Sequence, residues 1–130
     1  MLIISDATGY YLSDPEFWWP NYFSGYQAYL ASIRRLMELG AEVLCLSHNG
    51  VVTGARAVRA YFEGALAATQ AYHERIVADA QSGKTAREIA GKLGSQVYAR
   101  TQLLPLDFFQ KNCGLLVKQS LRHAGLEPGK

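Results

Sequence analysis

The stretch LIISDATGYY, at residues 2–11, decides how the fold is interpreted. Three consecutive apolar residues, Leu2 to Ile4, run directly into Ser5 and Asp6. A short apolar run that ends in polar residues is typical of a buried strand. The sequence therefore predicts a strand over residues 2–5 whose end presents the carboxylate of Asp6.

A second stretch, AEVLCLSHNG at residues 41–50, has the same form, because its apolar run ends in Ser47 and His48. In layered α/β proteins, ligands and catalytic groups gather beyond the carboxyl ends of strands. An aspartate and a histidine in such positions suit a divalent metal ion, since both side chains bind zinc, iron or manganese. Each residue also has a simpler interpretation, Asp6 as a turn residue and His48 as a hydrogen-bonded loop residue.

The rest of the chain is interpreted as part of one unit, residues 1–130, with the strands confined to residues 1–53 and a helical region over residues 54–130. Helical spacing of apolar residues predicts four helices. They are expected from a Ser24–Gln27 capping box to Gly40, from residue 54 to about Ala80, from a Thr85–Glu88 capping box to Gly94, and from Asp107 as the cap to about His123.

An aromatic-rich segment, residues 9–25, separates the first strand from the first helix. It contains both tryptophans, Trp18 and Trp19, and three turn-forming residues, Pro15, Pro20 and Gly25. Burial of large aromatic side chains is strongly favourable, so an ordered loop is expected. We interpret this loop either as a lid over the core or as the wall of a pocket.

The composition is that of one globular domain of 130 residues with a net charge of +2. So small a basic excess gives no indication of a nucleic-acid or membrane partner. The two cysteines, Cys45 and Cys113, form no CxxC pair and are interpreted as buried free thiols. With no apolar run of membrane-spanning length and no signal-peptide pattern, a soluble cytoplasmic protein is expected.

The order of these features resembles the C-terminal half of metallo-β-lactamase-fold hydrolases. ISDATGYY, an aromatic loop, a capped amphipathic helix, GAEVLCLSHNGV and a long helix follow one another along the chain. The resemblance implies an α/β fold, the C-terminal half of a four-layer αββα sandwich with a mostly helical tail. It also implies that Asp6 bridges two metal ions and that His48 binds the second ion, although SHNG here replaces the family's Gly-His-Gly setting.

The family's His-x-His-x-Asp-His signature is missing from this sequence. Its only histidines are His48, His73 and His123, and the last two lie in helical patterns, where we interpret them as solvated or packing residues. A hydrolytic zinc site needs about three protein ligands and an open position for water, whereas this sequence offers two ligands. The chain is therefore expected to be a fragment, inactive alone, that pairs with a missing N-terminal half or forms a homodimer.

For the complete enzyme, the resemblance implies metal-dependent hydrolysis of an ester, thioester or lactone in a small-molecule substrate. The nucleophile would be a metal-activated water, with zinc, iron or manganese as the divalent metal. Four aromatic residues that follow Asp6 in the sequence are the candidate substrate-binding residues: Tyr10, Tyr11, Trp18 and Trp19.

Two other interpretations stay open. The segment GKTAREIAGKLG, residues 83–94, resembles the first helix and turn of a helix-turn-helix, but few basic residues follow it, so nucleic-acid binding is the less favoured of the two. The other interpretation is a non-catalytic helical domain that only dimerises or binds a protein partner.

Overall fold

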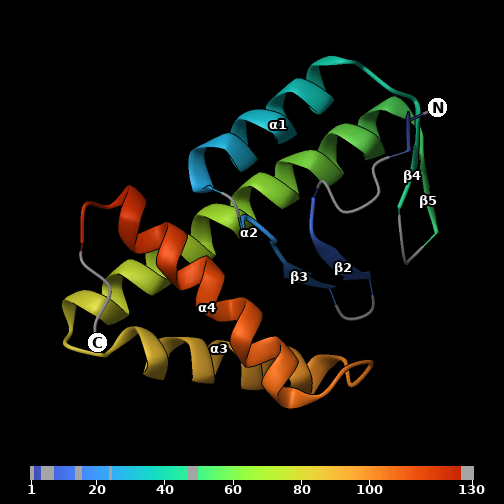
Figure 1. The fold of residues 1–130 in the computed structure, drawn as a ribbon. Coiled ribbons are helices and arrows are strands. Elements are labelled where there is room, and N and C mark those ends of the chain that lie inside the picture. Colours follow the sequence, from blue (N-terminus) through green and yellow to red (C-terminus); the bar gives the residue numbers. More distant parts are fainter. Residues whose placement is uncertain (1, 4–7, 14–15, 24, 47–49, 127–130) are drawn as a thin grey trace. The chain divides into compact units, whose positions relative to one another are not determined.

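The computed structural model describes residues 2–3, 8–13, 16–23, 25–46 and 50–126. This part of the chain is α/β and mostly helical, as the sequence predicts (Figure 1). Its helices are α1 (Tyr26–Glu38), α2 (Ala55–Gln81), α3 (Ala86–Arg100) and α4 (Leu106–His123). Its strands are β1 (Leu2–Ile3), β2 (Tyr10–Ser13), β3 (Glu16–Trp19), β4 (Val43–Cys45) and β5 (Val51–Thr53).

The chain divides into two compact units, and each is described by itself. Unit 1 comprises Met1–Asn21 and Gln27–Gln70, and unit 2 comprises Tyr22–Tyr26 and Ala71–Lys130. The boundary falls inside helix α2, whose first part belongs to unit 1 and whose last part belongs to unit 2.

The larger sheet of unit 1 has the strand order β1–β4–β5. Strand β1 is parallel to β4, with Ile3 opposite Cys45, and β5 returns antiparallel to β4. Parallel neighbours need a long crossover connection, which here includes β2, β3 and α1. The two predicted strands are confirmed where the structure describes them, whereas β5 is a strand that the apolar pattern does not predict.

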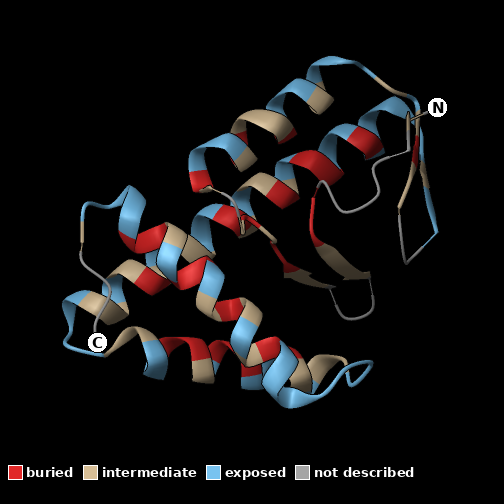
Figure 2. Ribbon diagram, viewed as in Figure 1, coloured by how far each residue is buried: buried red, intermediate tan, exposed pale blue. Residues whose placement is uncertain are grey.

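The core of unit 1 forms between α1, β4 and α2. Helix α1 confirms the predicted amphipathic helix, and Figure 2 shows the buried residues on one face of it and of α2. Complete burial of each large apolar side chain contributes about 1.5–3 kcal/mol. The predicted cap Ser24 lies outside the described residues. The buried members of this core are Ile33, Leu44, Val58, Tyr61, Phe62 and Ala65.

The aromatic segment contains a β-hairpin, so the prediction of a loop throughout residues 9–25 is wrong. Strands β2 and β3 pair antiparallel, with Tyr11 opposite Trp18 and their ring centroids 4.3 Å apart. Such cross-strand aromatic pairs stabilise a hairpin. They produce neither a helical nor a simple alternating pattern of apolar residues, so the sequence pattern does not predict the hairpin. Gly9 enters the hairpin at φ 81°, where a β-carbon would overlap the carbonyl oxygen of Trp19.

Helices α3 and α4 form the larger part of unit 2, with residues 101–105 between them. The Thr85–Glu88 capping box is confirmed, because the Glu88 amide donates to Thr85 Oγ1 at 3.1 Å. Helix α3 does not stop at Gly94, as predicted, but continues to Arg100. At Gly94 a β-carbon would overlap the backbone of Gln110, so this glycine permits close packing of α4 and does not end the helix.

The predicted cap of the last helix is also wrong. Asp107 lies in the first turn of α4, whose N-cap is Pro105, a residue that makes no side-chain cap hydrogen bond. Proline suits a helix start because its fixed φ matches the helix and it has no amide hydrogen to satisfy. The carboxylate of Asp107 still complements the positive end of the helix dipole.

Candidate functional site

The two predicted metal ligands, Asp6 and His48, lie outside the described residues, but the strands that precede them are parallel neighbours. Ile3 of β1 is opposite Cys45 of β4, and Asp6 and His48 each follow this pair at the same distance in sequence. Parallel strands have their carboxyl ends at one edge of the sheet. The described strands that precede Asp6 and His48 in the sequence therefore end at the same edge of the sheet.

The chain is anchored again just after the first of these segments. The Thr8 side chain is 2 % exposed, and its Oγ1 forms a hydrogen bond of 2.8 Å with the hydroxyl of Tyr61 on α2. Tyr61 packs edge-on against Tyr11, with ring centroids 5.4 Å apart, and lies 4.9 Å from the ring of Trp18. Residues 4–7 are thus bounded by β1 on one side and by a buried hydrogen bond on the other.

Burial also determines the protonation of this hydroxyl. Desolvation raises the pKa of Tyr61, and the hydrogen bond with Thr8 opposes that shift only in part. The phenol therefore stays neutral at physiological pH and can donate or accept a hydrogen bond. Its arrangement with Thr8 is a structural anchor close to Asp6 in sequence, and we assign no reactive role to it.

The second segment is bounded on both sides by strands. The Leu46 amide donates to the carbonyl oxygen of Gly50 at 2.9 Å, directly after the Cys45–Val51 pair of the β4–β5 ladder. Residues 47–49 therefore join two paired strands, and His48 is the central residue of that connection in sequence.

The four candidate substrate-binding residues all lie on the β2–β3 hairpin. Tyr10 is opposite Trp19, which is buried, and Tyr11 is opposite Trp18. Tyr11 and Trp18 are partly buried and pack against the core of unit 1. Trp18 is also close to α2, since a β-carbon at Gly64 would lie 2.9 Å from its ring. These contacts give three of the four side chains a packing role; binding of a substrate stays a prediction.

The two helical histidines, which we interpret from the sequence as solvated or packing residues, come together in unit 2. His73 of α2 stacks on Tyr26, with ring centroids 4.1 Å apart and an interplanar angle of 20°. The ring of His123, at the end of α4, lies 5.3 Å from that of His73 and 5.0 Å from that of Tyr26. Fifty residues separate the two histidines in the sequence, and no spacing rule links them.

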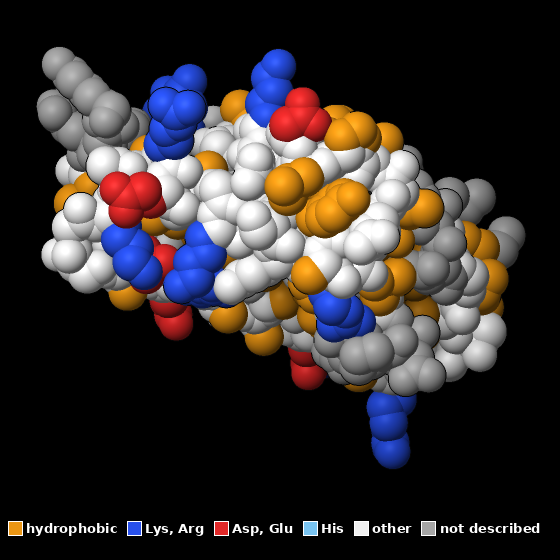
Figure 3. Space-filling model, turned by 90° about the horizontal axis from the view of Figure 1, so that it is seen from below, with side chains coloured by type: hydrophobic (Ala, Val, Ile, Leu, Met, Phe, Trp, Pro, Cys, Tyr) orange, Lys and Arg blue, Asp and Glu red, His pale blue; other side chains and the backbone are white. Residues whose placement is uncertain are grey.

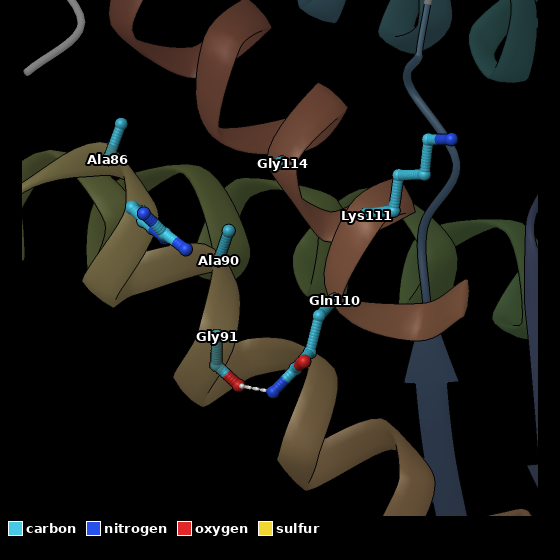
Figure 4. A pocket seen from close by; sticks show the side chains of 7 residues that line it. Ala86, Ala90, Gly91, Gln110, Lys111 and Gly114 are labelled. Carbon is cyan, nitrogen blue, oxygen red and sulfur yellow. Dashed lines mark hydrogen bonds between the residues drawn. The ribbon is translucent and has the colours of Figure 1, made fainter. Parts of the chain in front are cut away.

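A pocket of about 510 Å³ opens between α3 and α4 in unit 2 (Figure 4). In this view the Gln110 side chain reaches from α4 to α3, where its Nε2 donates to the Gly91 carbonyl oxygen at 3.3 Å. Exposed Arg87 and Lys111 contribute charge to the lining. The remaining lining residues are small ones that let the helices pack closely, and we assign no ligand to the pocket.

Across the described ranges of the chain, no three side chains of histidine, cysteine, aspartate or glutamate lie close enough to hold a metal ion together. None of the described helices combines the length and the apolar character needed to cross a membrane. No protein-family model matches the chain, and no curated protein matches it.

Proposed function

We propose that this chain is the C-terminal part of a metal-dependent hydrolase of the metallo-β-lactamase superfamily, acting on an ester, thioester or lactone. The observation that carries the proposal is the parallel pairing of β1 with β4. Strands β1 and β4 precede Asp6 and His48 in the sequence, and their carboxyl ends lie at one edge of the sheet, which supports a shared metal site. The αββα sandwich of the complete enzyme, with this chain as one half, is part of the same proposal.

The donor set suits a divalent ion but does not complete a hydrolytic site. A carboxylate oxygen and an imidazole nitrogen both bind zinc, iron or manganese, and a hydrolytic site needs about three protein ligands. Such an ion would act as a Lewis acid that activates water. The chain itself supplies two ligands, Asp6 and His48, and the Thr8–Tyr61 hydrogen bond that fixes the chain next to the first of them. The other ligands would come from a missing N-terminal half.

Paramagnetic broadening by manganese tests whether Asp6 and His48 share a metal. We expect Mn²⁺ to broaden the amide signals of Thr8 and Gly50 together in a two-dimensional NMR spectrum, because these described residues flank the two segments. Asp6→Asn should abolish both effects. Asp107→Asn, which removes an exposed carboxylate from α4, is the matched control and should leave them unchanged.

Broadening at only one of the two segments, or broadening that survives in Asp6→Asn, would contradict a shared site. Hydrolysis is measured in parallel on ester, thioester and lactone substrates with added zinc or manganese. We expect no hydrolysis by this chain alone, since two ligands leave the ion incompletely held. Activity that requires both Asp6 and His48 would retain the reaction class but contradict the need for a missing half.

The non-catalytic interaction domain is a second candidate, favoured by the exposed apolar side chains of unit 2. Leu103 is 73 % exposed and Phe108 is 41 % exposed. Figure 3 shows that hydrophobic side chains gather on the face drawn there, as is common at protein-binding surfaces. We call the following set the apolar patch: Leu103, Leu104, Leu106, Phe108 and Leu115.

Light scattering coupled to size-exclusion chromatography tests this second candidate. If the apolar patch mediates self-association, the wild-type chain elutes as a dimer and Leu103→Ser/Phe108→Ser elutes as a monomer. Leu39→Ser removes a leucine of similar exposure, 66 %, from unit 1 and should leave the dimer intact. A wild-type monomer at every concentration would contradict self-association through this patch.

A further inference from the structure

The histidine pair of unit 2 has the separation of two ligands of one metal ion. Two imidazoles that bind a tetrahedral ion through nitrogens at about 2.0–2.1 Å place their ring centroids roughly 5.2 Å apart. The centroids of His73 and His123 are 5.3 Å apart, with an interplanar angle of 69°. The rings come from two different helices, α2 and α4, and Tyr26 stacks on His73.

A buried polar atom at this site lacks a partner. Nδ1 of His73 is inaccessible to solvent and makes no hydrogen bond within the described part of the chain. An unsatisfied buried donor or acceptor costs about 1–3 kcal/mol, and such atoms in native proteins often mark a bound ion or water.

The surroundings of the pair disfavour a proton on His73. Burial lowers the pKa of His73, and repulsion from His123 lowers it further, while Glu74 acts in the opposite direction. Neutral imidazole is the form that binds a metal ion. His123 is the last residue of α4, where the negative end of the helix dipole also stabilises positive charge.

We propose that His73 and His123 form a binding site for a divalent transition-metal ion of the class that imidazole prefers, such as zinc, nickel or copper. The exposed side chain of His123 faces solvent, so water completes the coordination. The site is built from residues of unit 2 and does not involve Asp6 or His48. It therefore stands whether or not the proposed hydrolase function is correct.

Copper binding to the His48→Gln variant tests the proposal, because this variant keeps His73 and His123 as its only histidines. We expect one Cu²⁺ per chain by calorimetry. Its electron paramagnetic resonance spectrum should show coupling to two imidazole nitrogens. Zinc should compete for the same site and raise the thermal unfolding temperature.

His123→Gln in the same background is the decisive variant, since His123 is exposed whereas His73 is partly buried, so its loss should disturb the packing of unit 2 less. Loss of one ligand should weaken copper binding by at least about tenfold. The two-nitrogen signal should be replaced by a one-nitrogen signal. Nickel should broaden the amide signals of Tyr26 and Ala124 only when His123 is present.

The proposal is wrong if the His48→Gln variant binds no copper, or if its copper signal survives in His73→Gln/His123→Gln. A spectrum with a single nitrogen ligand would also overturn it, because that result means binding to one histidine and not to the pair. The manganese experiment on Asp6 gives an independent result, so failure of one site is distinguishable from failure of the other.

Discussion

The hydrogen bond between Thr8 and Tyr61 fixes the described residue that lies nearest in the sequence to the candidate ligand Asp6. Its partners are 53 positions apart in the sequence, and both are buried. The bond fixes the backbone two residues after Asp6 against α2. The place of Asp6 after an apolar run makes it a candidate from the sequence alone, whereas no periodic pattern relates Thr8 to Tyr61, so their hydrogen bond cannot be predicted in that way.

Removal of the Tyr61 hydroxyl should therefore destabilise unit 1. In Tyr61→Phe the Thr8 hydroxyl stays buried without its partner, and we expect the free energy of unfolding to fall by about 1–3 kcal/mol. Urea denaturation followed by tryptophan fluorescence measures this change. The double variant Thr8→Val/Tyr61→Phe removes both partners and should recover much of the loss, and equal loss in both variants would contradict this explanation.

The ring cluster around His73 predicts a pH dependence. The pKa of His73 in the folded chain lies below its ordinary value of 6.5, mainly because of burial and next because of His123. The unfolded chain then binds the proton more readily than the folded chain below pH 6.5. The contribution of the neutral ring to stability is complete above that pH and is lost as the pH falls toward the folded pKa.

Urea midpoints compared at pH 8 and pH 5 test this direction. The wild-type midpoint should fall with acidification, and His73→Gln should show a smaller fall because it cannot take up the proton. His123→Gln should lie between the two, since it removes only the repulsion and leaves the burial of His73. Equal pH dependence in wild type and His73→Gln would contradict this assignment.

At the scale of elements, two glycines of α3 differ in whether the packing of α4 leaves room for a side chain. A β-carbon at Gly94 would overlap the Gln110 backbone, whereas at Gly91 its nearest atom would be 4.0 Å away. Gly94→Ala should cost about 1–3 kcal/mol through overpacking against α4. Gly91→Ala is the matched control and should be neutral or stabilising by up to about 1 kcal/mol, because alanine favours the helix.

Circular dichroism during urea denaturation measures both variants, since unit 2 is largely helical. A loss of stability in Gly91→Ala equal to that in Gly94→Ala would mean that glycine is needed at both positions for another reason. A stable Gly94→Ala variant would require α4 to shift away from α3 at no cost.

The elements predicted best are those with a local cause. Strand β4 follows from an apolar run, α1 and α2 follow from their stripes, and the start of α3 follows from its capping box. The errors arise where a distant residue decides the outcome. Gly94 resembles a helix end in the sequence, but its role is to allow close packing against Gln110 of α4. Because α3 continues past Gly94, the turn that a helix-turn-helix needs at that point is absent. The β2–β3 hairpin likewise depends on pairing across strands.

At the scale of the whole molecule, helix α2 connects the two units without interruption. Gln70 is the last residue of unit 1 and is exposed in the middle of this helix. Proline in a helix interior costs about 3 kcal/mol. We expect Gln70→Pro to lower two urea unfolding midpoints, one measured by tryptophan fluorescence and one by helical circular dichroism. The fluorescence reports unit 1, because both tryptophans lie there.

Gln70→Ala, which keeps the helix, is the control and should leave both midpoints near those of the wild type. If the proline variant changes only one of the two signals, the units are energetically independent in spite of their common helix. Of the candidate sites, the pair Asp6 and His48 could be proposed from the sequence because each residue follows a local apolar run, and it stays a prediction. The His73–His123 pair could not, since only the packing of α2 and α4 unites it.

The interleaved order of the units has a consequence for synthesis on the ribosome. Tyr22 belongs to unit 2, and its hydroxyl is hydrogen-bonded to the Ser120 side chain at 2.7 Å, across 98 positions of the chain. At about 5–20 residues per second, Ser120 is made roughly 5–20 s after Tyr22. During the second half of this interval, after Gln70 has been made, the segment Tyr22–Tyr26 lies in the sequence between two parts of unit 1 that have both been synthesised. A nascent chain would thus keep the Tyr22 hydroxyl without its Ser120 partner until translation is nearly finished, and a chaperone that binds exposed aromatic segments would find its target there.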